Sequence, residues 1–361
     1  MGIKLSDVDK NFALETLTDL KDIKFYDIKS NPFKIYGADK ATFERKGLWR
    51  IPEALANECN LIWGANCPAG FRVRFKSDSE YVAIKVKFAN QPEVVNVLSQ
   101  SCDLYVDYEN GSRFAGRFSP TNALSDGYEA VIHFGTREER SFTLNLLTYE
   151  MVKDVYIGLQ SDATVSEGMQ YNNHKPIVYY GSSITQGGRA SRPGNTYQSI
   201  ICRRTNTDYV NLGFSGRAKA EIPVMEYISN LDMSIFVYDY DHNAPSLDYL
   251  KETHERGYKI VREKNPDLPI VLISKPDFEN RESTNHEHFK NVIRRTVVMQ
   301  TYINAINSGD KNVYFIDGAQ FFNVDEGDCC VCDGCHPTDY GFVRMADIIG
   351  NQIKAIQRKM R

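Results

Sequence analysis

The pattern of apolar residues changes once along the chain, near residue 172. Before that point, apolar residues recur at every second position over short stretches, as they do in half-buried strands. The clearest of these stretches contain Val82, Ile84, Val86 and Phe88, then Phe142, Leu144 and Leu146, and then Val155, Ile157 and Leu159. Many short strands with frequent turns favour a β-sandwich or jelly roll for residues 1–172.

One turn between two of these strands has a specific sequence. Asn110 and Gly111 lie between two runs rich in aromatic residues, 104–108 and 113–118. Both residue types tolerate the positive φ angles that a two-residue hairpin turn requires. We therefore predict a β-hairpin that turns at these two residues.

From residue 173 onward, short apolar runs alternate with helical patterns. The apolar runs are 177–180, 209–212, 234–240, 270–274 and 313–316. The helical patterns lie near residues 196–205, 220–228, 246–261, 286–307 and 342–356. Strand and helix alternating five times is typical of a parallel sheet with helices on both faces. The predicted fold class is α/β, with a three-layer α/β/α unit at residues 173–361.

Composition narrows the class of protein. At about 150 residues per domain, 361 residues predict two domains. The 43 basic and 47 acidic residues give a net charge of −4, which argues against a nucleic-acid or anionic-membrane partner. No apolar run approaches the ~20 residues that span a bilayer, and residues 1–11 lack the apolar core of a signal peptide. We therefore expect a cytoplasmic protein with reduced cysteines.

Four polar segments should meet at one edge of the parallel sheet. Three of them follow predicted strands, at 181–185, 211–216 and 241–245, and the fourth, 333–337, precedes the last helix. Ligands of open parallel sheets bind at the carboxyl ends of the strands. We therefore expect a serine, a glycine, an asparagine and an Asp-x-x-His pair to converge there.

In this order, the four segments resemble the sequence blocks of the SGNH (GDSL-like) hydrolase superfamily, whose hydrolase domain is flavodoxin-like. The resemblance implies that Ser183 is the nucleophile, that His336 is the base and that Asp333 orients His336. It also implies an oxyanion hole made by the backbone N–H groups of Ser183 and Gly216 and the side-chain amide of Asn243. These roles suit the chemistry, because a hydroxyl attacks only after an imidazole accepts its proton.

The resemblance spans about residues 174–361, with three departures from the superfamily pattern. Ser182 stands where most members have an aspartate that supports the loop. Asp241 replaces a glycine and Ala244 replaces an aspartate, while Asn243 between them is kept.

The N-terminal half carries a second, shorter resemblance. Residues 101–105, Ser-Cys-Asp-Leu-Tyr, resemble the motif of the GxDLY-type β domain that precedes some bacterial esterases of this superfamily. Ser101 replaces the glycine of that motif. Trp49 and Trp63 have two open interpretations, a sugar-binding face or burial in the sandwich. It also stays open whether this half binds sugar, packs as a lid or mediates a homo-oligomer.

The cysteines offer a competing interpretation. Cys329, Cys330, Cys332 and Cys335 crowd one loop. The segment 332–336, Cys-Asp-Gly-Cys-His, matches a c-type haem attachment motif, which requires export. A zinc site at Cys332 and Cys335 lacks a second ligand pair and would involve the predicted Asp333 and His336. We therefore expect no metal, no cofactor and free thiols that are open to oxidation.

Taken together, these features predict a serine hydrolase of the carboxylesterase or acetylesterase type. It would remove acyl groups, acetyl first among them, from a carbohydrate or similar small polar ester through an acyl-enzyme on Ser183. The expected partner is a small-molecule or oligosaccharide ester. The alternatives are a lipase, thioesterase or acyltransferase that uses the same site, and a non-catalytic carbohydrate-binding protein.

Overall fold

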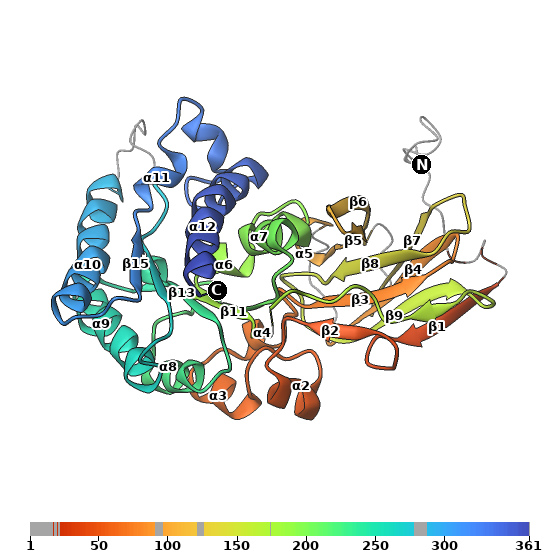
Figure 1. Cartoon of the computed structure of the whole chain (residues 1–361), viewed down its shortest axis with the longest axis horizontal. Coiled ribbons are helices and arrows are strands. Elements are labelled where there is room, and N and C mark those ends of the chain that lie inside the picture. The colour runs from red at the N-terminus through yellow and green to blue at the C-terminus, as the bar shows by residue number, and fades with distance from the viewer. Residues whose placement is uncertain are drawn as a thin grey trace, which may run out of the picture.

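The computed structural model describes residues 17, 20, 22–90, 97–120, 126–173, 175–277 and 287–360. Residues 1–11, on which the signal-peptide prediction rests, lie outside this set. Antiparallel sheets come first along the chain, and a parallel sheet covered by helices follows (Figure 1). The predicted fold class, a β-sandwich followed by a three-layer α/β unit, is confirmed.

Two antiparallel sheets form the N-terminal half. One contains, in spatial order, β1 (Ile23–Asp27), β9 (Val152–Gln160), β4 (Tyr81–Phe88) and β7 (Gly127–His133). The other contains, in spatial order, β10 (Val165–Ser166), β3 (Arg72–Ser77), β8 (Arg140–Asn145), β5 (Cys102–Tyr108) and β6 (Gly111–Phe118), with β2 (Lys34–Tyr36) also paired to β3. The two sheets share one core, to which β4 contributes Val82, Ile84 and Val86, and β8 contributes Phe142 and Leu144. The alternation predicted for these stretches is confirmed.

The predicted hairpin forms, but its turn lies one residue earlier than expected. Strands β5 and β6 are antiparallel, and Tyr108 pairs with Gly111 at the turn end of the ladder. Glu109 and Asn110 therefore make the turn, and Gly111, with a φ of 127°, begins β6. Strand register decides where the turn falls, and the local sequence does not reveal that register.

The five strands predicted in the C-terminal half form one parallel sheet. Their spatial order is β12 (Tyr209–Gly213), β11 (Ile177–Gly181), β13 (Ile235–Asp239), β14 (Ile270–Ile273) and β15 (Val313–Ile316). The α-helices of this half are α6 (Ser183–Gln186), α7 (Tyr197–Thr205), α8 (Ile222–Ser229), α9 (Leu247–Lys264), α10 (Glu287–Asn307), α11 (Ala319–Phe322) and α12 (Asp339–Met360). The alternation of strands and helices is as predicted.

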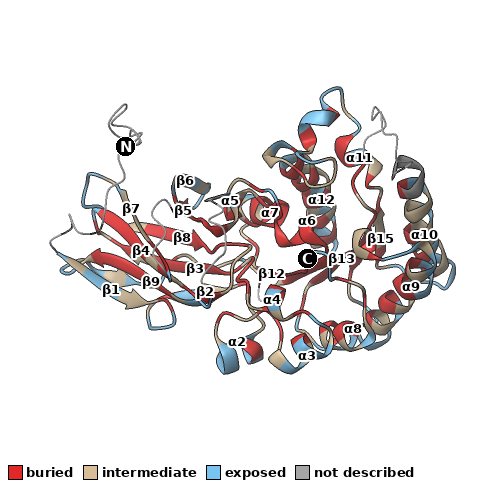
Figure 2. Ribbon diagram, turned by 180° about the vertical axis from the view of Figure 1, so that it is seen from behind, coloured by how far each residue is buried: buried red, intermediate tan, exposed pale blue. Residues whose placement is uncertain are grey.

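Alternate residues of each parallel strand face opposite helical layers. Ile177 and Tyr179 of β11 share a core with α7 and α12, whereas Val178 and Tyr180 share a core with α8, α9 and α10. Both faces of the sheet are therefore buried (Figure 2). This burial explains why the strands are continuous apolar runs in the sequence.

In the described part of the chain, no helix is long and apolar enough to cross a membrane. The cytoplasmic location stays a prediction.

The N-terminal half also contains short helices that the sequence pattern does not predict. They are α2 (Lys40–Lys46), α3 (Glu53–Glu58), α4 (Ile62–Ala65) and α5 (Val97–Gln100). Ile51, Ala56 and Leu61 pack into the core beneath the parallel sheet, together with Val178. This early segment therefore ties the two halves of the chain together. The division into domains at residues 1–172 and 173–361 stays a prediction.

A fully buried arginine strengthens this connection. The guanidinium of Arg50 donates to the carbonyls of Gly64, Asn211 and Gly213 and lies 4.6 Å from the ring centroid of Phe214. Burial lowers the pKa of Arg50 to about 10, so the group still carries its charge at neutral pH. Asn211 and Gly213 belong to β12, so Arg50 fixes the end of a strand that leads into the predicted site.

We predict that Arg50→Met lowers the free energy of unfolding by at least about 3 kcal/mol, because three buried carbonyls lose their charged donor. The measurement is the midpoint of urea denaturation. The matched control is Arg204→Met, which removes an exposed ion pair with Asp347 and should cost less than about 1 kcal/mol. Equal losses in the two variants would contradict the role given to Arg50.

Candidate active site

Ser183 lies at the carboxyl end of a central strand. Strand β11 ends at Gly181, Ser182 is the N-cap of α6, and Ser183 is the first residue of that helix. The Ser182 hydroxyl accepts a hydrogen bond from the N–H of Ile184 at 3.2 Å. Ser182 thus supports the loop with a side-chain cap, as an aspartate would. The N–H of Ser183 has no acceptor within its own helix, because first-turn amides never do.

The predicted base and its orienting acid reach Ser183 from the loop before α12. The Ser183 Oγ lies 2.8 Å from the His336 Nε2, although the two residues are 153 positions apart. On the opposite side of the ring, Nδ1 lies 2.9 Å from the Asp333 Oδ2. The Asp333 Oδ1 also accepts the backbone N–H of His336 at 2.8 Å, which fixes the carboxylate against the ring. The structure therefore brings the three predicted residues into one hydrogen-bonded chain.

These contacts shift the pKa of both ionisable partners. Burial alone would raise the pKa of Asp333, but hydrogen bonds from the backbone and ring of His336 lower it to about 2. Hydrogen bonding to Cys335, together with the charge of Asp333, outweighs burial and raises the pKa of His336 above its ordinary value of 6.5. A guanidinium also faces the pair, with the Arg189 Nε 3.3 Å from the Asp333 Oδ2.

The predicted oxyanion donors lie on two neighbouring loops. Gly216 is exposed with a φ of 66°, and a Cβ added there would meet no atom within 4 Å. The Asn243 Nδ2 donates to the carbonyl of Phe214 at 2.9 Å, which joins the loop after β13 to the loop that carries Gly216. A side-chain amide has two N–H groups, so this bond leaves the second one for a ligand. The N–H of Ser215 bonds to the Gln186 Oε1 at 2.9 Å, which ties the same loop to α6.

Two aromatic residues of the N-terminal half complete the surroundings of Ser183. The Tyr149 hydroxyl donates to the carbonyl of Ser183 at 3.0 Å, and its ring packs 5.6 Å from Trp63. Gly188 leaves room for this approach, because a Cβ there would lie 2.8 Å from the Tyr149 hydroxyl and 3.2 Å from a carbon of the His336 ring. Sequence analysis missed Tyr149, because no motif marks a tyrosine in a loop after a sandwich strand.

The two tryptophans have different environments, and neither lies in the sandwich core. Trp49 is half-buried and packs against the core of the α/β half. Trp63 is 42% exposed and lines a cavity of about 420 Å³ with Phe214, Ser215 and Arg217. This cavity adjoins the loop that carries Gly216.

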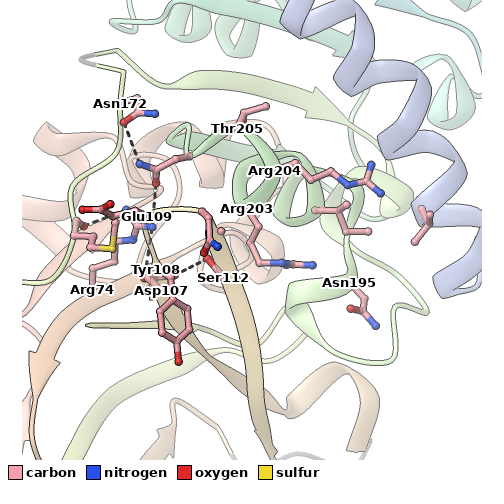
Figure 3. Close-up of a pocket in the computed structure, with 16 residues that line it drawn as sticks. Arg74, Asp107, Tyr108, Glu109, Ser112, Asn172, Asn195, Arg203, Arg204 and Thr205 are labelled. Atoms are coloured by element: carbon pink, nitrogen blue, oxygen red, sulfur yellow. Dashed lines mark hydrogen bonds and ion pairs between the residues drawn. The ribbon is translucent and has the colours of Figure 1, made fainter. Parts of the chain in front are cut away.

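A larger cavity, of about 820 Å³, lies elsewhere. It is formed by the turn between β5 and β6 and by α7, as Figure 3 shows. Its lining contains none of the predicted site residues. Several of its polar groups are already paired, including Asp107 with Ser112 and Arg74 with Asn206. The predicted chemistry therefore lies outside this cavity.

Cys332 and Cys335, whose spacing raised the possibility of a zinc site, have different neighbours in the structure. All eight cysteines lie in described residues and are free thiols. The Cys332 Sγ is directed at the carbonyl of His336, 3.4 Å away. The Cys335 Sγ lies 3.1 Å from the Nε2 of His242. Among the described residues, one group of three has donor atoms close enough to hold a metal ion, namely Asp333, Cys335 and His336.

Comparison with known families identifies the family of this chain. Residues 174–354 match the GDSL-like lipase/acylhydrolase family, and this match covers half of the chain. The chain belongs to the GDSL-like lipase/acylhydrolase family. Residues 23–165 match the GxDLY domain, described as the N-terminus of SGNH-hydrolase-type esterases, so both predicted resemblances are confirmed. Membership in the family indicates an ester hydrolase. No curated protein matches the chain.

Solved structures share the whole two-part arrangement. A GDSL-like lipase from Bacteroides ovatus is 27% identical, with a TM-score of 0.83 over 93% of this chain and 98% of the other. A salicylyl-acyltransferase from a tetracycline biosynthetic pathway is 18% identical, with a TM-score of 0.74 over 93% and 98% of the chains. A family two carbohydrate esterase from Cellvibrio japonicus is 10% identical, with a TM-score of 0.61 over 94% and 99%. At such identities the last two show a common fold.

We predict that kcat/KM falls as the pH drops through the pKa of His336, because a protonated imidazole cannot accept the Ser183 proton. The raised pKa places this midpoint above 6.5. Asp333→Asn should move the midpoint to lower pH and reduce kcat by about 10⁴-fold, since the imidazolium loses its carboxylate. Asp328→Asn, an exposed acid in the same loop, is the control. A midpoint that Asp333→Asn leaves in place would contradict the prediction.

Proposed function

We propose that this family member is a serine esterase that removes acyl groups, acetyl first among them, from a carbohydrate or a similar small polar ester. The observation that carries the proposal is the 2.8 Å contact between the Ser183 Oγ and the His336 Nε2, with Asp333 on the other ring nitrogen. An imidazole in this position converts a weakly nucleophilic hydroxyl into an attacking group.

The reaction divides into two halves. His336 accepts the Ser183 proton as the Oγ attacks the ester carbonyl, and the carbonyl oxygen becomes an oxyanion. His336 then gives that proton to the departing alcohol, which leaves an acyl group on Ser183. A water molecule that loses its proton to His336 attacks this acyl-enzyme, and its collapse releases the carboxylic acid and restores Ser183. Asp333 stays ionised throughout, which its lowered pKa favours.

The oxyanion would lie near the open backbone of two loops. The N–H of Ser183, at the first position of α6, and the N–H of Gly216 are the proposed backbone donors. Asn243 would add its second amide N–H, because the first is bonded to Phe214. Donors fixed in this way typically contribute roughly 3–4 kcal/mol each to the stability of the transition state.

Three observations support a sugar ester as substrate. Trp63 presents an exposed indole beside the loop of Gly216, and sugars pack their C–H faces on such rings. The cavity beside it has mixed apolar and polar lining, which suits a small polar substrate better than a long acyl chain. Among the structural neighbours, the protein from Cellvibrio japonicus is a carbohydrate esterase, and another such esterase, from Clostridium thermocellum, was solved with cellohexaose.

The deciding experiment compares Ser183→Ala with Ser182→Ala on p-nitrophenyl acetate and on acetylated oligosaccharides. Ser183→Ala should lose at least about 10³-fold in kcat, because the hydroxyl that is acylated is gone. Ser182→Ala removes only a helix cap, which costs about 1 kcal/mol of stability, and should keep most of the activity. The two substitutions differ by one position and are chemically identical, so they separate chemistry from folding.

Inactivity of the wild type on every ester would contradict the proposal and favour a non-catalytic carbohydrate-binding protein. Faster reaction with p-nitrophenyl palmitate than with acetate would indicate a lipase. Rapid formation of a new ester when a second alcohol is present, with little free acid, would indicate an acyltransferase.

A separate prediction concerns Trp63. Trp63→Ala should raise KM for acetylated oligosaccharides by about tenfold, which corresponds to the loss of roughly 1.4 kcal/mol of stacking. It should leave the hydrolysis of p-nitrophenyl acetate nearly unchanged, because that substrate carries no sugar ring that could stack on the indole. Tyr108→Ala is the matched control, since Tyr108 is also exposed but lines the larger, distant cavity. An equal effect of both substitutions would contradict the role of Trp63.

A further inference from the structure

A thiol and an imidazole that the proposed reaction does not use lie against its Asp-His pair. The Cys335 Sγ is 3.1 Å from the His242 Nε2, and the two residues are 93 positions apart. His242 lies in a 3₁₀ turn, Asp241–Asn243, directly after β13. The Cys335 Sγ also lies within 4.8 Å of a ring nitrogen of His336. The thiol therefore lies between two imidazole rings.

Four side chains with metal-binding atoms are thus linked through the thiol of Cys335. Together they are called the thiol–imidazole cluster, which consists of His242, Asp333, Cys335 and His336. The donor atoms of three of them lie within 4.8 Å of one another. The fourth, the Nε2 of His242, is the group that touches the thiol at 3.1 Å. Ligand atoms around a tetrahedral zinc ion lie roughly 3.5 Å apart, so small side-chain rotations would bring the cluster to that spacing.

The chemistry of the cluster selects among metal ions. A thiolate with two imidazoles and a carboxylate suits zinc and other soft divalent cations, whereas magnesium and calcium require oxygen ligands. When the proton of His242 resides on Nδ1, the lone pair of Nε2 is directed at the thiol. That Nδ1 has no hydrogen-bond partner among the described residues, and the positive charges of Lys275 and Arg294 are near enough to act on the ring. Metal binding is weakened when the second nitrogen of a histidine ligand has no hydrogen-bond acceptor, and also by positive charge near the ion. We therefore expect a dissociation constant in the micromolar range.

We propose that the thiol–imidazole cluster binds Zn²⁺ and that the bound ion inhibits the enzyme. Binding releases the thiol proton of Cys335, and the thiolate and imidazole nitrogens donate their lone pairs to the ion. Both nitrogens of His336 are already used, one by Ser183 and one by Asp333. An ion on either nitrogen must displace one of these contacts. The inhibition rests on the proposed function, whereas the binding does not.

The first test measures binding without catalysis. The Ser183→Ala protein, stripped of metal with a chelator, is titrated with Co²⁺, whose coordination by a thiolate produces a charge-transfer absorption in the near ultraviolet. We expect this absorption in Ser183→Ala and in Ser183→Ala/Cys332→Ser. We expect its loss in Ser183→Ala/Cys335→Ser, because only the Cys335 thiol faces the two imidazoles. Zn²⁺ should displace the Co²⁺.

The second test measures inhibition in the otherwise unaltered enzyme. Micromolar Zn²⁺ should reduce ester hydrolysis at least tenfold, and a chelator should restore it; without added Zn²⁺, the chelator should have no effect. Cys335→Ser should need at least tenfold more Zn²⁺ for the same inhibition, whereas Cys332→Ser should behave as the wild type. If Cys335→Ser fails to fold, His242→Gln takes its place and should weaken Co²⁺ binding and inhibition alike.

The outcomes separate the two claims. Absence of the Co²⁺ absorption, or its persistence after loss of Cys335, overturns the metal site. Equal Zn²⁺ sensitivity of wild type and Cys335→Ser overturns inhibition through the cluster. A protein that shows the absorption but hydrolyses no ester keeps the metal site and refutes the proposed function.

Discussion

The parallel pairing of β11 with β12 and β13 is the constraint on which the candidate site depends. In this register Gly181 lies opposite Gly213 on one side and opposite Asp239 on the other. The three strands therefore end at one level, and the loops that carry Ser183, Gly216 and Asn243 begin there. A shift of one residue in any strand would exchange its buried faces and turn its loop away. The apolar cores on both sides of the sheet oppose such a shift.

The N-terminal half supplies side chains to the candidate site, although it lies before the hydrolase half in the sequence. Arg50 bonds to the end of β12, Tyr149 bonds to the carbonyl of Ser183, and Trp63 borders the adjacent cavity. Arg72, a buried arginine of β3, adds a further connection, because its guanidinium donates to the carbonyl of Tyr209 in β12. Loops and a short helix of the N-terminal half therefore form part of the wall of the site, and the loops at the sheet edge are held from both halves of the chain.

Residue patterns predicted the strands well, because burial on one face or on two faces leaves a direct periodic signal. Spacing along the chain and family resemblance also predicted that Ser183, Asp333 and His336 would meet. Contacts that depend on packing were missed. Tyr149 and Trp63 reach the site from a loop and a short helix of the N-terminal half, and only the packing of the two halves brings them there. Cys335 lies 3.1 Å from His242, which is 93 positions earlier in the chain, and no spacing in the sequence indicates that contact.

The central claim is that Ser183 is the residue acylated during ester hydrolysis, and covalent trapping tests it most directly. A fluorophosphonate reacts with an activated serine and leaves a stable phosphonyl group, which peptide mass spectrometry can assign to one residue. We expect one group per chain, on Ser183, and none when His336 is replaced by alanine. Phosphonylation of Ser182 or of another residue, or full ester hydrolysis by a protein whose Ser183 remains unmodified, would contradict the claim.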